Sequence, residues 1–192
     1  LNSRRLIAQK KALEYKVQVA TKEIREQKEV VEKQKKHIEE KHKEVTDSIN
    51  YAQRIQKAML KEEEHVRTHL PEHFVLFIPK DIVSGDFYWA AEKEGHWYLA
   101  AVDCTGHGVP GAFMSMLGMS FLNEITSINK LQTPAEILNQ LRDKVIKELR
   151  QTGAADDSKD GMDISLIRLN LRTKELQWAG ANNSLYLIIN NE

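Results

Sequence analysis

Three absences limit what this chain can be. It has one cysteine among 192 residues, which excludes a disulfide framework and a cysteine-rich zinc site. No apolar run approaches the roughly 18–20 residues that would span a bilayer, and no signal peptide is visible. The first 70 residues contain neither glycine nor proline, although the whole chain has nine glycines and four prolines. A stretch of that length without either helix breaker predicts one long helix.

The zero net charge of the chain is the average of two unlike halves. Residues 1–70 carry 17 Lys and Arg against 12 Asp and Glu, whereas residues 71–192 carry 11 against 16. The second part also holds every glycine and proline and most of the aromatic residues. We therefore expect a helical domain at 1–70 and a mixed globular domain at 71–192, divided between Leu70 and Pro71, in a fold of class α+β.

The first domain has the heptad pattern of a coiled coil. One column of positions seven residues apart is apolar, and its β-branched members favour a parallel two-stranded arrangement. The companion column is polar at Gln27, Gln34 and Lys41, and each such position forfeits on the order of 1–3 kcal/mol relative to a buried leucine. We therefore expect a weak parallel homodimer. The apolar column consists of Val17, Ile24, Val31, Ile38, Val45, Ala52 and Met59.

Other interpretations of this helix are a single charged helix in solvent and a basic surface for nucleic acid or membrane. Acidic residues are interleaved throughout the basic ones, which disfavours a phosphate-binding stripe, so we expect no nucleic-acid partner. The functional interpretation is a dimeric connector that passes rotations or register shifts between modules. A weak seam suits that role because two packings of the helices can lie close in energy.

The second domain alternates short apolar runs with turn signals, which predicts strands around two helices. A turn rich in glycine and proline at 105–111 precedes an apolar helix expected over 112–128. Thr133-Pro134-Ala135-Glu136 predicts the start of the next helix, with Thr133 as its N-cap and its end near residue 151. The expected strands are 73–79, 87–91, 97–103, 162–170, 175–179 and 184–189.

Two carboxylates lie beside glycine-rich backbone at the ends of expected strands. Asp86 follows Ser84-Gly85, and Asp103 precedes Cys104-Thr105-Gly106. Hard divalent cations such as Mg²⁺ and Mn²⁺ bind carboxylate oxygens, backbone carbonyls and retained waters. Two carboxylates brought together with no basic neighbour repel each other unless a cation lies between them. The alternative is that both residues only cap turns, and composition does not decide between the two.

Four motifs carry a family resemblance: DIVSGDFYW (81–89), AVDCTGHGVPGAFMSMLG (101–118), DGMDISLIRL (160–169) and WAGANNSLYLI (178–188). In combination they resemble the SpoIIE-type branch of the bacterial type-2C metal-dependent protein phosphatases (the PPM family). The preceding INYAQRIQKAML (49–60) resembles the helix that joins upstream sensor modules to such domains. The resemblance implies a long N-terminal coiled-coil helix followed by a partial α-β-β-α sandwich.

The resemblance also implies a binuclear metal site. Asp86 and Asp103 match two family metal ligands, and Cys104, where many relatives have glycine, would contribute its backbone carbonyl. Two Mn²⁺ or Mg²⁺ ions would activate a water against the phosphorus of phosphoserine or phosphothreonine, with no covalent phosphoenzyme. His107 is a candidate proton donor, although the family suggests that it shapes the loop. A thiol nucleophile at Cys104 is the rival interpretation, but no motif pairs it with a base.

Two further positions are read from the same motifs. Asp163 precedes a strand in the family pattern and is not an established ligand there. Asn182 lies near the loop where eukaryotic relatives place an aspartate for an accessory metal, so the asparagine argues against such a site.

The resemblance implies two more aspartate ligands beyond the last expected strand. Because the chain begins at Leu1 and stops at Glu192, we expect a piece of a longer protein that binds metal weakly and is inactive or nearly so. The alternative function is a non-enzymatic dimeric scaffold or a pseudo-phosphatase.

We expect regulation through the last part of the helix. The apolar positions of the heptad pattern continue through Val45, Ala52, Ile55 and Met59 to the edge of the second domain. We expect this part to pack on the helix after Gly108, so that a shift in the coiled coil moves Asp103 relative to Asp86. The implied partners are a phosphoprotein substrate and an upstream sensor module, in the cytoplasm, free or tethered to a membrane sensor.

Overall fold

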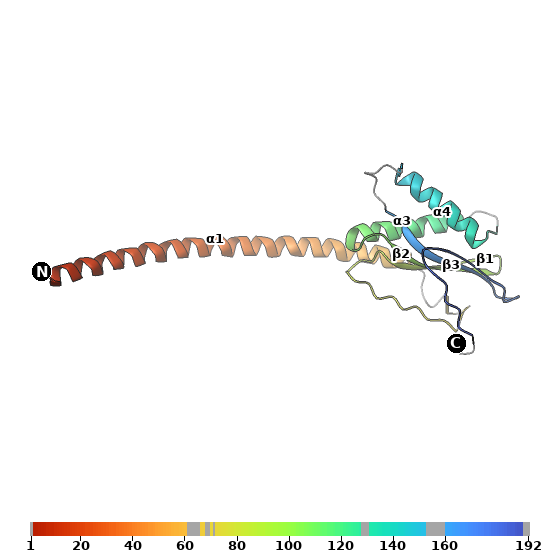
Figure 1. Ribbon diagram of the computed structural model, residues 1–192, viewed down its shortest axis with the longest axis horizontal. Helices are drawn as coiled ribbons and strands as arrows, with labels where there is room; N and C mark the ends of the chain where they lie inside the picture. The colour runs from red at the N-terminus through yellow and green to blue at the C-terminus, as the bar shows by residue number, and fades with distance from the viewer. Residues whose placement is uncertain are drawn as a thin grey trace. The chain divides into compact units, whose positions relative to one another are not determined.

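The computed structural model describes residues 2–60, 66–67, 70, 72–127, 131–152 and 160–189. Figure 1 shows its elements in chain order: α1 (Asn2–Met59), β1 (Phe87–Lys93), β2 (His96–Cys104), α3 (Gly108–Ser127), α4 (Pro134–Glu148), β3 (Met162–Asn170) and β4 (Leu176–Ala181). The predicted α+β class, with a long helix first, is confirmed. Among the described helices, none is both long and apolar enough to cross a bilayer.

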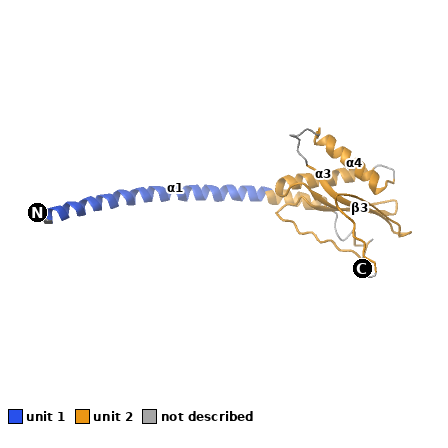
Figure 2. Ribbon diagram, in the orientation of Figure 1, with its two compact units in different colours: residues 1–48 blue, residues 49–192 orange. Residues whose placement is uncertain are grey.

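The chain divides into two compact units, residues 1–48 and residues 49–192 (Figure 2). The last turns of α1 therefore belong to the same unit as the sheet, which adds a helical segment to the globular part. The predicted domain boundary between Leu70 and Pro71 concerns which segments fold independently. The division by contacts does not test it, and it stays a prediction.

Unit 1 is a regular α-helix with its side chains in solvent. Lys and Glu four residues apart approach each other along it, as at Lys22–Glu26 (3.8 Å) and Lys35–Glu39 (3.8 Å). Each exposed pair of this kind contributes only a few tenths of a kcal/mol, about 0.2–0.5, to helix stability. The apolar column is uncovered in the single chain: Ile24 is 64% exposed and Ile38 65%.

Unit 2 is built on an antiparallel sheet in the order β1-β2-β3-β4. Side chains alternate between its two faces because successive residues of a strand point in opposite directions. In the register, Phe87 pairs with Val102 and Val102 with Ile164, so these side chains share a face. This face carries most of the hydrophobic core, and α3 and α4 cover it. Its buried strand residues are Phe87, Trp89, Tyr98, Ala100, Val102, Cys104, Ile164 and Leu166.

Polar contacts fix the helices on this face. The indole N–H of Trp89 in β1 donates to the Asn123 side chain of α3 (2.8 Å), and the Tyr98 hydroxyl donates to the carbonyl of Gln132 before α4 (2.6 Å). Thr133 caps α4 as predicted: its hydroxyl accepts from the Glu136 amide, and the Glu136 carboxylate accepts from the Thr133 amide. These contacts hold α3 and α4 against one face of the sheet. Neither helix covers the opposite face.

Two segments predicted as strands are extended but pair with no described strand. Residues 73–79 and 184–189 lack the ladder of backbone hydrogen bonds. Their apolar side chains are exposed, for example Phe74 (87%) and Tyr186 (87%). The alternating sequence pattern identifies an extended segment but not a partner, and a strand exists only where a partner is present. The prediction of strands at these two places was wrong for that reason.

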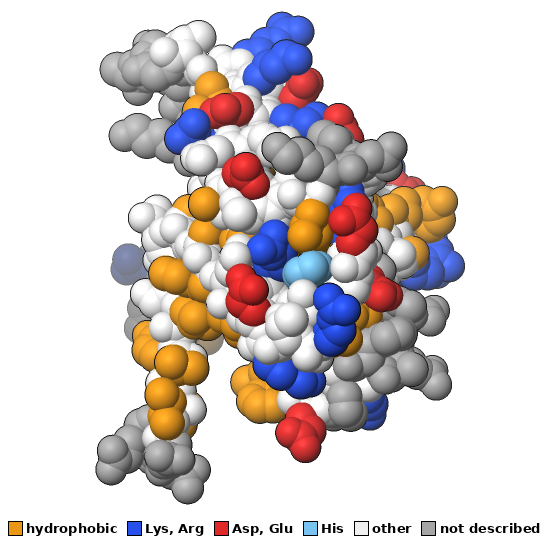
Figure 3. Space-filling view, turned by 90° about the vertical axis from the view of Figure 1, so that its right-hand side faces the viewer, with side chains coloured by type: hydrophobic (Ala, Val, Ile, Leu, Met, Phe, Trp, Pro, Cys, Tyr) orange, Lys and Arg blue, Asp and Glu red, His pale blue; other side chains and the backbone are white. Residues whose placement is uncertain are grey.

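The face of the molecule drawn in Figure 3 mixes all kinds of side chain. Lys and Arg are interspersed with Asp and Glu, and hydrophobic side chains reach the surface in several places. Interspersed charges give no extended field of one sign on this face.

The burial of Leu166 in β3 predicts the effect of shortening its side chain. Leu166 is fully buried between the sheet and the helices, so Leu166→Ala should lower the free energy of unfolding by about 2–5 kcal/mol. Urea denaturation followed by circular dichroism measures this. Leu176→Ala in β4, where the leucine is 48% exposed, is the matched control and should cost clearly less. Equal losses for the two variants would contradict the assignment of the core to the helix-covered face.

Candidate metal centre

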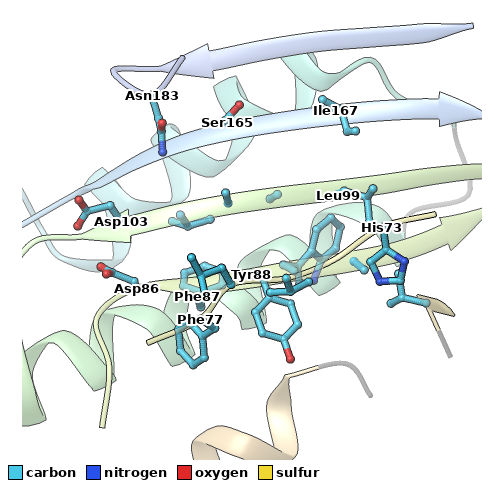
Figure 4. Close-up of a pocket in the computed structure, with 18 of the residues that line it drawn as sticks. His73, Phe77, Asp86, Phe87, Tyr88, Leu99, Asp103, Ser165, Ile167 and Asn183 are labelled. Carbon is cyan, nitrogen blue, oxygen red and sulfur yellow. The ribbon is translucent and has the colours of Figure 1, made fainter. Parts of the chain in front are cut away.

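The carboxylates of Asp86 and Asp103 lie side by side at one end of the sheet. In the β1–β2 ladder Phe87 pairs with Val102, and continuing the register by one position sets Asp86 opposite Asp103. Both side chains belong to the face opposite the helices, and Figure 4 shows them next to each other at the end of a groove. The sequence therefore predicted correctly that these two residues come together, although their role as ligands stays a prediction.

The surroundings of Asp86 raise the cost of ionising its carboxyl. Partial removal from water raises the pKa of the Asp86 carboxyl, and the negative charge of Asp103 and a hydrogen bond with it raise this pKa further. A carboxyl in this position holds its proton to a higher pH than it would in the unfolded chain. Oxygen donors that repel each other in this way match what a hard divalent cation binds, so the pair fits such an ion.

A third aspartate lies next to Asp103 on the neighbouring strand. Asp163 of β3 is the register partner of Asp103, and its carboxylate accepts a hydrogen bond from the Asn182 amide (3.1 Å). No role was predicted for Asp163, because only the register of β2 and β3 brings it beside Asp103. Even so, the described residues contain no group of three or more His, Cys, Asp or Glu with the geometry to hold a metal ion.

The backbone around Asp86 is packed more closely than any side chain would allow. A Cβ added to Gly85 would lie 2.5 Å from the Gly106 carbonyl oxygen, and one added to Gly111 would lie 2.5 Å from the same oxygen and 2.9 Å from the Gly85 Cα. The turn at Gly106 has φ of 86°, which glycine adopts without strain. Three glycines thus let the loop before β1, the turn after β2 and the start of α3 meet beside the carboxylates.

Cys104 has its thiol in the core. The side chain is 3% exposed, and burial together with the charges of Asp86 and Asp103 raises its pKa to about 12. A thiol in this state is protonated at neutral pH and is a poor nucleophile. Its carbonyl oxygen would lie 3.4 Å from a Cβ on Gly85, so it borders the loop that carries Asp86.

His107 points to a different carboxylate. Its Nδ1 lies 2.9 Å from an Asp81 oxygen, and both side chains are substantially exposed. This pair ties the turn after β2 to the segment before Ser84, which agrees with a loop-shaping role. A proton-donor role for His107 stays a prediction.

An apolar groove runs from the carboxylates along the same face of the sheet. It encloses about 700 Å³ and has the extended segment 73–78 as one wall. The ring of Phe77 meets that of Tyr88 edge to face, with 5.7 Å between their centres. The two acidic groups lie at its end, so a molecule in the groove would approach them along an apolar surface (Figure 4).

The four residues expected to transmit regulation have different surroundings. Met59 packs against the main core and Ala52 is partly buried, whereas Ile55 is 45% exposed and Val45 58%. Sequence reasoning missed Gln56, which is buried near the end of α1 and bonds to Ser84 and Ser115.

Comparisons with known proteins match this chain to a family model and to a solved structure. The family model of stage II sporulation protein E (SpoIIE) matches residues 93–192. Among solved structures, the SiaA-PP2C domain of Pseudomonas aeruginosa is similar, with 34% identity and a TM-score of 0.59. The match covers 73% of this chain and 55% of that structure, so this chain spans a little over half of its length. None of the curated proteins compared with the chain matches it.

The raised pKa of Asp86 predicts how stability changes with pH without metal. As the pH rises past the ordinary Asp pKa of about 4, the unfolded chain loses this proton before the folded chain does. The folded state is therefore destabilised progressively until its own raised pKa is passed. Asp86→Asn removes the charge, so it should flatten this fall and raise the melting temperature at pH 7 slightly.

Calorimetry in chelator at several pH values measures this prediction. Asp143→Asn is the control, because it removes one negative charge from an exposed pair with Arg142, of a kind that contributes little. If the melting temperature fell equally with rising pH in Asp86→Asn and in Asp143→Asn, the carboxylate pair would not be the source of that fall.

Proposed function

This chain belongs to the SpoIIE-type branch of the PPM protein phosphatases, and on that premise we propose that it dephosphorylates phosphoserine or phosphothreonine in a protein with the help of divalent cations. The observation that carries the proposal is the adjacency of Asp86 and Asp103 at the end of an apolar groove. Family membership supports the phosphatase class, whereas the metal and the substrate residue are our inference.

The chemistry of the donors supports Mn²⁺ or Mg²⁺. The Asp86 and Asp103 carboxylates would hold the ions, with the Cys104 carbonyl as a further oxygen donor beside the Gly85 loop. Two such ions, when bound, lower the pKa of water and stabilise negative charge on a phosphoryl group. Binding also relieves the repulsion that raises the pKa of Asp86, so the ion and the deprotonated pair stabilise each other.

The remaining residues of the site orient and shield the reacting groups. The close contact of Gly85, Gly106 and Gly111 fixes the backbone from which Asp86 projects, so the carboxylate needs no reorganisation when a phosphate arrives. The apolar groove provides a surface for the part of the substrate next to its phosphorylated residue. We assign no proton transfer to the buried Cys104 thiol, because its pKa is raised to about 12.

We expect weak metal binding by the 192-residue chain, since two carboxylates are a small ligand set. Its Kd for Mn²⁺ should be on the order of 1 mM, as for weak oxygen-ligand sites, and turnover of a phosphopeptide should be slow. Asp86→Asn and Asp103→Asn should each weaken Mn²⁺ binding at least about tenfold. Electron paramagnetic resonance of free Mn²⁺ measures the affinity, and phosphate release measures turnover.

Asp47→Asn, on the exposed part of α1, controls for the loss of one negative charge and should change neither quantity. Robust Mn²⁺-dependent turnover by this chain would refute the argument for a weak site. Unchanged Mn²⁺ affinity in both site variants would remove the hydrolase proposal and favour a non-enzymatic scaffold.

We also propose that the protein works as a parallel homodimer controlled by an upstream sensor module, in the cytoplasm or tethered to a membrane sensor. Support comes from the apolar column on α1, whose side chains are exposed in the single chain, as at Ile24 and Ile38. A second copy with the same column would cover it. The polar companion column keeps the pairing weak, which suits a connector with two packings of similar energy.

The dimer proposal predicts a concentration-dependent mass in sedimentation equilibrium. Ile38→Glu places a charge in the apolar column and should shift the equilibrium to monomer, because two carboxylates would face each other in the seam. Gln18→Glu is the matched control: it adds the same charge next to the column but outside both seam positions, so it should leave the mass unchanged. A monomeric wild-type chain at all concentrations would contradict the proposal.

A further inference from the structure

The side-chain amide of Gln56 replaces a missing strand partner for the backbone of Ser84. Its Nε2 donates to the Ser84 carbonyl (2.6 Å), and its Oε1 accepts from the Ser84 amide (3.0 Å). These are the two bonds that a neighbouring strand would make with one residue of a ladder. Since Ser84 lies in a loop outside the sheet, the last turns of α1 provide what the sheet does not.

The surroundings determine which way the amide points. Gln56 is 5% exposed, and its Nε2 also donates to the hydroxyl of Ser115 in α3 (2.7 Å), which is itself fully buried. Turning the amide over would place its oxygen against the Ser84 carbonyl oxygen and its NH₂ against the Ser84 amide, which would lose both bonds. Neither a carboxylate nor an apolar side chain of this size can replace it.

The loop that carries Asp86 is thus held from two sides. Gln56 holds the peptide groups of Ser84 on one side, and the Gly106 carbonyl and the start of α3 press against Gly85 on the other. Asp86 follows directly and is outside the regular part of β1, which begins at Phe87. The position of its carboxylate relative to Asp103 therefore depends on the peptides before it.

We propose that Gln56 is a positioning residue, which holds the Ser84–Asp86 loop so that Asp86 faces Asp103, and through which α1 sets the geometry of the carboxylate pair. The inference rests on the proposed function, because it takes the pair as the metal site. Gln53, one turn earlier, donates a single bond to the Ile82 carbonyl (2.6 Å) and holds no atom of Ser84. It is the matched control on the same helix.

The first test needs no metal. Gln56→Met keeps the size of the side chain and removes its hydrogen bonds, so hydrogen exchange of the Ser84 amide, followed by NMR in chelator, should become about tenfold faster. Amides of the central strands, such as Val102, should exchange as in the wild type, and Gln53→Met should leave Ser84 unchanged. Unchanged exchange at Ser84 in Gln56→Met would overturn the inference. Faster exchange at all amides would also overturn it, because Gln56 would then only stabilise the fold.

The second test uses Mn²⁺ alone as the probe. Gln56→Met should raise the Kd for Mn²⁺ about tenfold, because the ligand is displaced and not removed, whereas Gln53→Met should leave the Kd unchanged. If Asp86→Asn abolishes binding but Gln56→Met binds like the wild type, the inference is wrong and the proposed function stands. If Asp86→Asn has no effect, the proposed function fails, and the exchange of Ser84 alone decides whether Gln56 holds the loop.

A variant that does not fold is replaced by a milder one. Gln56→Asn keeps the amide but is one methylene shorter, so it cannot reach both atoms of Ser84. It should show the same faster exchange at Ser84 and the same weaker Mn²⁺ binding, and wild-type behaviour in both measurements overturns the inference.

Discussion

The repulsion between two neighbouring carboxylates is the constraint around which unit 2 is organised. The β1–β2 register sets Asp86 beside Asp103, and partial burial of Asp86 together with the charge of Asp103 raises the pKa of Asp86. A fold that keeps such a pair must hold it by other contacts or neutralise it with a bound cation. Here tight backbone packing holds the loop, and the chemistry of the two carboxylates suits a hard divalent ion.

Backbone contacts, not side-chain packing, hold the acidic end of the sheet. Gly85, Gly106 and Gly111 approach so closely that no Cβ fits at two of them, and Gln56 bonds to main-chain atoms of Ser84. Such contacts transmit small displacements, because close-packed atoms cannot absorb them by rotating a side chain. The apolar groove beside them is looser, with an extended wall that belongs to no sheet.

Hydrophobic periodicity and helix breakers in the sequence predicted the elements whose signals lie in neighbouring residues. The cap at Thr133, the apolar α3 and the strands β1 to β4 follow from spacing alone. The Asp86–Asp103 pair was predictable because one residue directly precedes the first strand of a hairpin and the other lies near the end of the second. The unpaired state of segments 73–79 and 184–189 was not predictable, since strand pairing depends on a partner elsewhere in the chain. Gln56 was missed because a polar residue in a charged helix gives no sign that it is buried until α3 and the Ser84 loop are placed around it.

The last turns of α1 can serve two purposes at once because they use different faces of the helix. Ile55, which falls in the companion column of the heptad, is 45% exposed, while its neighbour Gln56 is buried. Successive residues of an α-helix are separated by about 100° around its axis, which follows from 3.6 residues per turn. A partner helix can therefore contact Ile55 while Gln56 holds Ser84, and a rotation of the paired helices would move the Gln56 amide against the peptide groups that precede Asp86. In the proposed dimer, a change in the packing of the two helices would reach the Ser84–Asp86 loop through Gln56.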